Sequence, residues 1–368
     1  MSWTRAYWLA AVCVLVAGCA QPARSVPAGP AAASVPLAAQ AAYRAVPGRC
    51  PPDAVFVRLD TEIRGYPSTA AGVTRPCALI SGPRTQLLER GPITISVHGD
   101  LHSLSFQANG TNGLTIQGSN ATGDAAPLRV ANADQDHVAL AVDSAINDYI
   151  VASEEYTGDN CWYVVPNRAT GPSRSNCDNR VAAIHALAID PRNELLVAGT
   201  DIVGGAGRID VFADPAASSP RRVRSIVGPA TGLASLSGTL GYYDISFSLT
   251  TDPQSGTIYV YDHLFNVLGG GAIPGAAAAK ISEFAADANG NVAPTRTLSG
   301  PLVRLVAAAF GVDILGVDRR GELFVLTAAT SPVISVFGAA AHGNAPPLRS
   351  FADPSATIGP VGAGLAVR

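Results

Sequence analysis

A seven-residue phrase, Gly-x-x-x-Pro-x-Arg, occurs three times in this chain and restricts its fold more than any other feature. The copies begin at Gly123, Gly290 and Gly343. Short strand-like segments recur before the phrase or its equivalent, at 114–117, 208–213, 280–285 and 333–338. Closing strands with a turn recur at 75–83, 224–229, 296–301 and 349–354. Repetition of this kind indicates a fold assembled from similar units.

The segments after each closing phrase complete the unit. An apolar strand ends near an Asp, a turn follows and a second strand returns, at 140–153, 187–199, 315–327 and, less regularly, 247–262. The turn dipeptides Asn-Asp, Arg-Gly and Ser-Gly suit hairpin connections. The unit therefore has four strands in about fifty residues, which is typical of a β-propeller blade.

The Gly-x-x-x-Pro phrase falls between the third and fourth strands of this unit. Glycine tolerates a positive φ and proline fixes its own φ, so both suit a tight link between two strands. We therefore interpret the phrase as blade architecture and not as a binding motif.

The number of inner strands predicts how the fold closes. Five of them are expected to begin near Ile93, Val138, Ala186, Ile245 and Ile314. A sixth lies at 362–368, and its sheet partners are expected at 54–59 and 77–82. One blade built from both termini would close the ring and remove exposed sheet edges. Because the chain has 37 Gly and 27 Pro and no sustained helical period, the sequence predicts an all-β, six-bladed propeller of four-stranded blades.

The segment at 280–300, KISEFAADANGNVAPTRTLSG, resembles the repeats of NHL-like and lactonase-type six-bladed propellers. The resemblance covers residues 54–368 and implies the same fold, with inner strands that line a central axis. These folds support many activities, so the resemblance does not select one. Metal lactonases of this architecture use a Glu/Asn/Asp/His set, and their motifs do not map onto this chain.

Residues 1–18 have the pattern of a lipoprotein signal peptide. Arg5 precedes an apolar run that is too short to span a bilayer. The run ends in Val-Ala-Gly-Cys19, which resembles the bacterial lipobox, whose cysteine becomes the acylated first residue. An ordinary signal peptide is the alternative. With Ala20 after the cysteine, the resemblance implies a lipid anchor in the cell envelope, on the periplasmic side of the outer membrane.

Residues 19–49 are rich in Ala and Pro and form a tether to a propeller domain at 50–368. Four cysteines remain in that domain: Cys50, Cys77, Cys161 and Cys177. In an exported chain an even number indicates disulfides, and three pairings are possible. We favour Cys50–Cys77 and Cys161–Cys177, because each pair brackets one local segment. A zinc site is the alternative, although no C-x-x-C or H-x-x-x-H accompanies these cysteines.

The charge balance limits the partners. Charged residues make up 14% of the chain, the formal net charge is -3 and Lys280 is its one lysine. Nucleic-acid binding needs clustered Lys and Arg, so it is not expected. No nucleophile elbow, Ser-His-Asp arrangement or phosphate loop is discernible.

Polar residues at or just before the inner strands are the candidate ligand or metal site: His137, His185, Asp244 and Asp313. Pseudo-symmetry would bring such positions toward the axis, where imidazole and carboxylate together suit a divalent metal or an acid/base pair. The alternative is that they are solvated side chains beside a wet channel. The loop 262–280 is expected on the same face as a lid or docking loop. Asp143, Asp190 and Asp318, at the opposite strand ends, are expected to stabilise turns.

Two functions remain open from the sequence. The first is a monomeric binding or interaction module that is held at the bilayer through acylated Cys19 and presents a face to a protein or glycan. The second is a metal-assisted, lactonase-like hydrolase with its site on the axis and a divalent metal as cofactor. The first is favoured because no catalytic constellation is specific.

Overall fold

The computed structural model describes ten ranges of the chain, which are 50–88, 91–105, 112–133, 137–152, 160–234, 243–266, 279–305, 314–327, 333–356 and 364–368. All of them belong to one compact unit, Leu37–Arg368. The predicted signal peptide and tether lie outside the described residues. Within these ranges the helices are single 3-10 turns at Pro83–Thr85 and Pro229–Thr231, and no described helix has the length or apolar character to cross a membrane.

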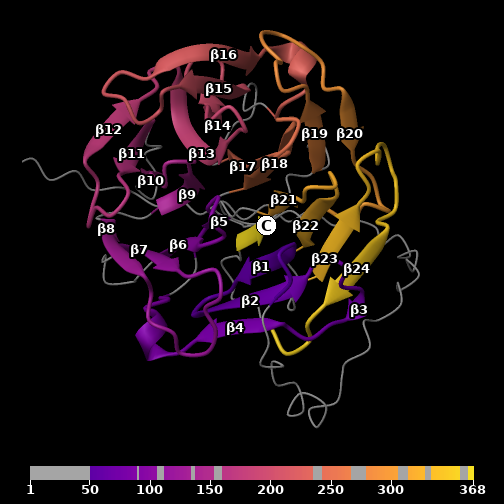
Figure 1. The fold of residues 1–368 in the computed structure, drawn as a ribbon. Coiled ribbons are helices and arrows are strands. Elements are labelled where there is room, and N and C mark those ends of the chain that lie inside the picture. Colours follow the sequence, from indigo (N-terminus) through magenta and orange to yellow (C-terminus); the bar gives the residue numbers. More distant parts are fainter. Residues whose placement is uncertain are drawn as a thin grey trace, which may run out of the picture. The chain divides into compact units, whose positions relative to one another are not determined.

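The described strands form six antiparallel four-stranded sheets, which we number as blades 1 to 6 (Figure 1). Blade 1 contains β5 (Ile93–Ile95), β6 (Leu101–Ser105), β7 (Asn112–Gln117) and β8 (Arg129–Ala133). Blade 2 contains β9 (His137–Val142), β10 (Asp148–Ala152), β11 (Cys161–Val165) and β12 (Arg174–Cys177). Blade 3 contains β13 (Val181–Ile189), β14 (Leu195–Asp201), β15 (Gly207–Ala213) and β16 (Arg221–Val227).

Blade 4 contains β17 (Tyr243–Thr251), β18 (Ile258–Asn266), β19 (Lys280–Phe284) and β20 (Arg296–Leu298). Blade 5 contains β21 (Leu315–Val317), β22 (Leu323–Thr327), β23 (Val333–Phe337) and β24 (Arg349–Ala352). Blade 6 contains β25 (Gly364–Val367), β1 (Ala54–Arg58), β2 (Glu62–Pro67) and β4 (Ala78–Ser81). The first strand of each blade contacts the first strands of its neighbours, so these six form the inner ring. The predicted six-bladed β-propeller is confirmed.

Ring closure also follows the prediction. β25 pairs antiparallel with β1, with Phe56 opposite Ala366, and β1 pairs with β2. The sequence did not indicate β2, because Glu62–Pro67 carries charges, a glycine and a proline in place of apolar alternation. Gly65 within it is required by close packing, since a Cβ there would lie 2.7 Å from the sulfur of Cys50. A further short strand, β3 (Gly72–Val73), pairs parallel with β24 of blade 5.

The repeated Gly-x-x-x-Pro phrase links the third and fourth strands of its blade, as predicted, and it also joins neighbouring blades. Gly123 of blade 1 forms a parallel bridge with Ile80, on the outer strand of blade 6. The Gly123 N–H donates to the carbonyl of Leu79 at 2.6 Å, and the Ser81 N–H donates back to the Gly123 carbonyl at 3.0 Å. The other copies form the same bridges, Gly290 with Ile226 and Gly343 with Leu298.

The residue after each of these glycines strengthens the clasp between blades. The side-chain oxygens of Asp124, Asn291 and Asn344 each accept a backbone N–H from the preceding blade, at 2.7 to 2.8 Å. The receiving turns contain Gly82, Gly228 and Gly300, whose φ angles of 118 to 125° favour glycine. The phrase therefore repeats because it holds adjacent blades together.

Apolar contacts fill the space between blades. Trp162 of blade 2 and Phe212 of blade 3 are both buried, and their ring centroids lie 4.8 Å apart. The corresponding contact between blades 5 and 6 is Phe351 against Tyr66, at 5.5 Å. Each blade thus completes its hydrophobic core against its neighbours, as expected of a closed repeat fold.

Buried polar groups also cross between blades. His102 of β6 has its Nδ1 2.5 Å from the Asp148 carboxylate of β10, which also pairs with Arg129 of β8. Nε2 of His102 is buried without a partner. The contact of His102 with Asp148 ties β6 of blade 1 to β10 of blade 2.

Both predicted disulfides are present. Cys50–Cys77 ties the start of the described chain to blade 6, and Cys161–Cys177 joins β11 to β12 at directly opposite positions. The four cysteines of the domain therefore form disulfides, as expected, and not a zinc site.

Candidate functional site

The sequence-predicted residues lie near the amino ends of three inner strands. His137 is the first residue of β9, His185 lies in β13 and Asp244 is the second residue of β17. Asp313 lies outside the described residues. The expectation that all of them stand at or just before a strand is wrong for His185 and Asp244, because β13 begins at Val181 and β17 at Tyr243.

The register explains this difference. β13 contains two irregularities, one between Val181 and Ala183 and one between Ile184 and Ala186. A bulge lets a strand continue past an extra residue, and bulges are frequent beside functional sites, where they redirect a side chain. His185 is the extra residue of the second bulge. The apolar pattern that begins at Ala186 therefore marks the middle of the strand.

His185 is the predicted residue whose side chain is described. It is half-buried, its Nε2 lies 3.3 Å from the Thr200 hydroxyl, and its ring centroid is 5.9 Å from that of Phe247 in the next blade. These contacts place the imidazole between blades 3 and 4.

The four candidates stand at different distances before the aligned leucines of the inner strands. His185 stands two residues before Leu187 and Asp313 two before Leu315. His137 stands three residues before Leu140, and Asp244 five before Leu249. At about 3.3 Å per residue, Asp244 is offset by about 10 Å along the axis from the level of His185. In the described part of the chain no group of three His, Cys, Asp or Glu side chains is placed to hold a metal. Convergence of the four residues stays a prediction.

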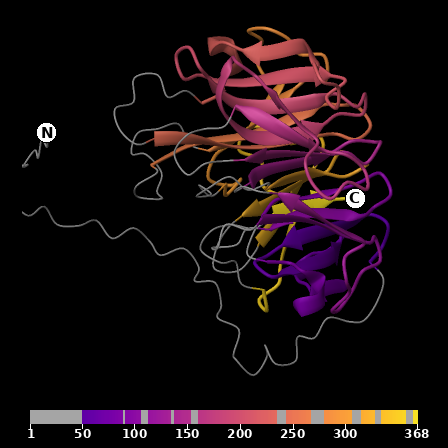
Figure 2. The same ribbon diagram turned by 90° about the vertical axis from the view of Figure 1, so that its left-hand side faces the viewer.

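The predicted loop at 262–280 is shorter than the sequence suggests. β18 continues to Asn266 and β19 begins at Lys280, so the part between 267 and 278 lies outside the described residues. Asp262 and Lys280 pair across the two strands at 3.1 Å. Figure 2 shows the open ends of β17 and β18 projecting on the side away from the C-terminus.

A cavity of about 960 Å³ lies at the opposite end of the inner ring, where the inner strands finish. We call this end the carboxyl-end face. All six inner strands contribute their last residues to the cavity walls. The cavity therefore lies on the propeller axis, and we call it the axial cavity.

Three levels of side chains recur around the axial cavity. The first level is buried, at 2 to 4% exposure, and consists of Ile93, Leu140, Leu187, Leu249, Leu315 and Leu365. The second level consists of small residues: Thr94, Ala141, Ala188, Thr250, Gly316 and Ala366. The third level is mostly β-branched and apolar: Ile95, Val142, Ile189, Thr251, Val317 and Val367. Each inner strand pairs on one side only, so the other edge of its backbone presents hydrogen-bonding groups toward the axis.

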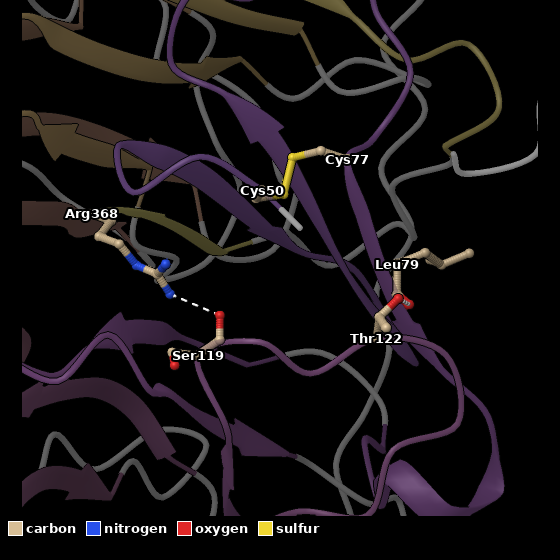
Figure 3. Close-up of a disulfide and its surroundings, with 6 residues drawn as sticks. All are labelled: Cys50, Cys77, Leu79, Ser119, Thr122 and Arg368. Atoms are coloured by element: carbon tan, nitrogen blue, oxygen red, sulfur yellow. Dashed lines mark hydrogen bonds between the residues drawn. A yellow bond between two sulfur atoms is a disulfide. The ribbon is translucent and has the colours of Figure 1, made fainter. Parts of the chain in front are cut away.

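Rigid turns form the rim of the axial cavity. The predicted turn role of Asp143, Asp190 and Asp318 is confirmed, because each buried carboxylate accepts the backbone N–H groups two and four residues further on, at 2.8 to 2.9 Å. The first disulfide, drawn in Figure 3, adds support, since Cys50 lines the cavity. Arg368 lines it too and donates to the carbonyls of Gly99 at 2.7 Å and Ser119 at 3.2 Å.

The rim charges are unevenly distributed. Blades 5, 6 and 1 contribute Arg319, Arg368 and His98 in succession. The other three blades contribute neutral residues and Asp190. Burial raises the pKa of the Asp190 carboxyl, although its backbone hydrogen bonds and Arg224 oppose the shift. The rim therefore has a cationic half and a half whose single acid is already engaged.

The site predicted from the sequence lies at the other end of the inner strands, and the axial cavity was not predicted. One sequence pattern could have indicated the cavity: most inner strands end in two apolar residues with a small residue between them, as in Leu140-Ala-Val142 and Leu315-Gly-Val317. That signal becomes visible only once the six strands are aligned in register.

Strand pairing and axial cavity together define a six-bladed β-propeller whose axis is open at the carboxyl-end face. No protein-family model matches the chain, and no curated protein matches it. Among solved structures it is similar to a protein from Lactobacillus plantarum and to a protein of unknown function from Bacteroides caccae. Both are 10% identical over 86% of this chain and 99% of theirs, with TM-scores of 0.45 and 0.47.

It is also similar to hydrazine synthase from Kuenenia stuttgartiensis, at 12% identity over 74% of this chain and 80% of that one, with a TM-score of 0.39. Similarity at this level carries no argument about function, and the fold rests on the strand pairing given above.

Proposed function

We propose that this chain is an exported, lipid-anchored β-propeller that acts as a binding module in the cell envelope, with the axial cavity as its binding site. The observation that carries the proposal is the cavity itself: about 960 Å³, lined by all six inner strands and bordered by fixed turns. Ligand sites are concave, largely apolar and preformed, with volumes of about 300 to 1,000 Å³. The position of the cavity on the axis and its Asp-stabilised rim make it concave and preformed, and its lining combines apolar side chains with polar groups.

Binding in the cavity is tested with a neutral apolar probe, N-phenyl-1-naphthylamine, titrated by fluorescence against the unit Leu37–Arg368, which contains every described strand. Saturable binding to one site is expected. Thr250→Trp places a large side chain at the middle level of the cavity and should abolish it. Leu128→Trp adds the same side chain at a position that is 68% exposed, away from the cavity, and should leave it intact. Equal binding by both variants would contradict the proposal.

Metal-assisted hydrolysis by His137, His185, Asp244 and Asp313 is the second candidate. The bulge at His185 supports it, because a bulge redirects a side chain at the amino-end face of the inner strands. Elemental analysis after dialysis tests it, and His185→Ala with Asp313→Ala should remove a bound metal without unfolding the domain. A metal-free wild-type protein with no esterase or lactonase activity would leave the binding module alone.

The envelope location rests on the Val-Ala-Gly-Cys19 sequence and the tether that follows it. Two or three acyl chains anchor firmly, because each buried CH₂ contributes about 0.8 kcal/mol. Protein or glycan partners and a monomeric state are part of the same proposal.

A further inference from the structure

We propose that the axial cavity selects organic anions: molecules with an apolar body, which the cavity walls cover, and an acidic group, which the cationic half of the rim holds. This inference rests on the proposed function, since it specifies the ligand class for the same cavity. It is carried by the uneven distribution of charge at the rim and by the contacts of each charged group there.

Arg319 is the principal anion-binding group. It lines the cavity, is exposed and has no ion-pair partner among the described residues. Its neighbour Arg320 differs, because that guanidinium pairs with Asp318 at 2.9 Å and Glu322 at 3.1 Å. Of two consecutive arginines on one turn, one stabilises the turn and the other is available to a ligand.

The turn that carries Arg319 is fixed before any ligand arrives. The buried Asp318 carboxylate accepts the N–H groups of Arg320 and Glu322, both at 2.9 Å. Glu322 in turn pairs with Arg349 of the outer strand β24, at 2.6 Å. A preorganised turn lowers the ordering cost of binding, so the long Arg319 side chain is the main group left to order.

Arg368 supplies a second positive charge on the adjacent inner strand. Its guanidinium donates to two backbone carbonyls and stacks over the Phe56 ring at 5.4 Å. These contacts hold the guanidinium in place at the rim. On the next inner strand in the ring, the exposed His98 adds a ring N–H donor to the same half of the rim.

The acids near the cavity are already engaged. Asp190 accepts two backbone N–H groups and faces Arg224 at 3.6 Å. Asp143 accepts two backbone N–H groups, the Asn147 amide and the Tyr149 hydroxyl. The carboxylates therefore serve the turns, and the potential at the rim is set by the arginines.

The apolar part of the ligand follows from the third level of side chains. Ile95, Val142, Ile189 and Val367 are all partly exposed at the cavity wall. Covering them excludes water from apolar surface and contributes about 25 cal/mol per Å². A compact inorganic anion would leave this surface uncovered, so the cavity favours an acid on an apolar body.

The test compares two probes with the same phenylnaphthylamine body. 8-Anilino-1-naphthalenesulfonate carries a sulfonate and N-phenyl-1-naphthylamine does not. Each is titrated by fluorescence against the unit Leu37–Arg368 at low salt. We expect the sulfonate to bind at least about tenfold more tightly, which corresponds to about 1.4 kcal/mol. Raising the salt should weaken the sulfonate and leave the neutral probe unchanged.

Arg319→Gln should lower the affinity for the sulfonate about tenfold and leave the neutral probe unaffected, because it removes a charge from an exposed side chain without touching the walls. Arg319→Lys should keep part of the preference. Arg221→Gln, at an exposed position on β16 away from the cavity, makes the same change in net charge and should alter neither affinity.

Each result decides between the two proposals. Equal affinity for both probes overturns anion selection and leaves the binding module. Binding of neither probe overturns both. A tightly bound sulfonate that is insensitive to both Arg319→Gln and Thr250→Trp occupies another site, which also overturns the inference.

Discussion

Replacement of Asp178 by Asn should change how the stability of the propeller depends on pH. Asp178 follows β12 and Asp210 lies in β15, and their side chains meet between blades 2 and 3, at 2% and 0% exposure. Burial and a hydrogen bond to Asp210 raise the pKa of Asp178 to about 6. The pKa of Asp210 is lowered instead. Burial alone would raise it, but hydrogen bonds from Asp178, Ser225 and Arg208 outweigh burial.

The magnitude follows from proton linkage. Asp178 rises from its ordinary pKa of 3.8 to about 6 in the folded protein. Between these values the folded state binds more protons than the unfolded state, so the free energy of unfolding falls as pH rises. A shift of about 2 units corresponds to about 3 kcal/mol, since each unit is about 1.4 kcal/mol. The stabilisation is complete below pH 4 and is lost as pH rises through 6.

Asn cannot ionise, and its amide can still donate to Asp210. The difference in stability between Asp178→Asn and wild type should therefore increase in favour of the variant by about 2 kcal/mol from pH 4.5 to pH 7.5, because the unfolded state is already largely deprotonated at pH 4.5. For a domain of this size that is about 3 °C in Tm. Urea unfolding at both pH values measures it, and titrating groups that do not contact Asp178 cancel in the difference. If the difference in stability between the two proteins did not change with pH, the raised pKa of Asp178 and its hydrogen bond to Asp210 would be refuted.

Three further outcomes are expected. Cys19→Ser in the full chain should release the protein from membranes and abolish acyl labelling, and unchanged partitioning would contradict the anchor. Leu365→Ala should lower the free energy of unfolding by about 3 kcal/mol, because this side chain of the closing strand is 2% exposed. Deletion of 364–368 should lower Tm further, because it opens the ring. An unchanged Tm after the deletion would exclude this closure. Gly228→Ala should lower the stability measured by chemical denaturation more than Gly232→Ala does. A Cβ at position 228 would lie 2.5 Å from Asn291 Oδ1, whereas no atom lies within 4 Å of a Cβ at position 232. Equal losses of stability would show that the clasp between blades does not stabilise the fold.

Features that depend on local signals could be predicted from the sequence. Gly-x-x-x-Pro links, Asp-stabilised turns and hairpins each use a few adjacent residues, and their repetition made them recognisable without an alignment. Ring closure followed from counting, because a sixth inner strand needed partners at 54–59 and 77–82, and β1 and β4 are found there. The same locality made the two short-range disulfides predictable.

Features that depend on register could not be predicted. The bulge at His185 moves the start of β13 away from the apolar pattern, so strand boundaries and candidate positions shifted together. β2 was missed because its contacts are long-range: Arg64 pairs with Asp353 at 2.8 Å, and Gly65 accommodates the Cys50 sulfur. Neither constraint produces a local apolar alternation.

The axial cavity shows how a repeat fold can carry specificity. The buried aspartates of blades 2, 3 and 5 fix turns of the rim, and a small middle residue recurs in all six inner strands. The exposed turn residues have no such role, so Ser144, Pro253 and Arg319 can occupy comparable places on blades 2, 4 and 5. Shape is thus common to the blades, while charge differs from blade to blade. A cationic half-rim on an otherwise regular ring is therefore more readily explained by recognition of an anion than by any requirement of folding.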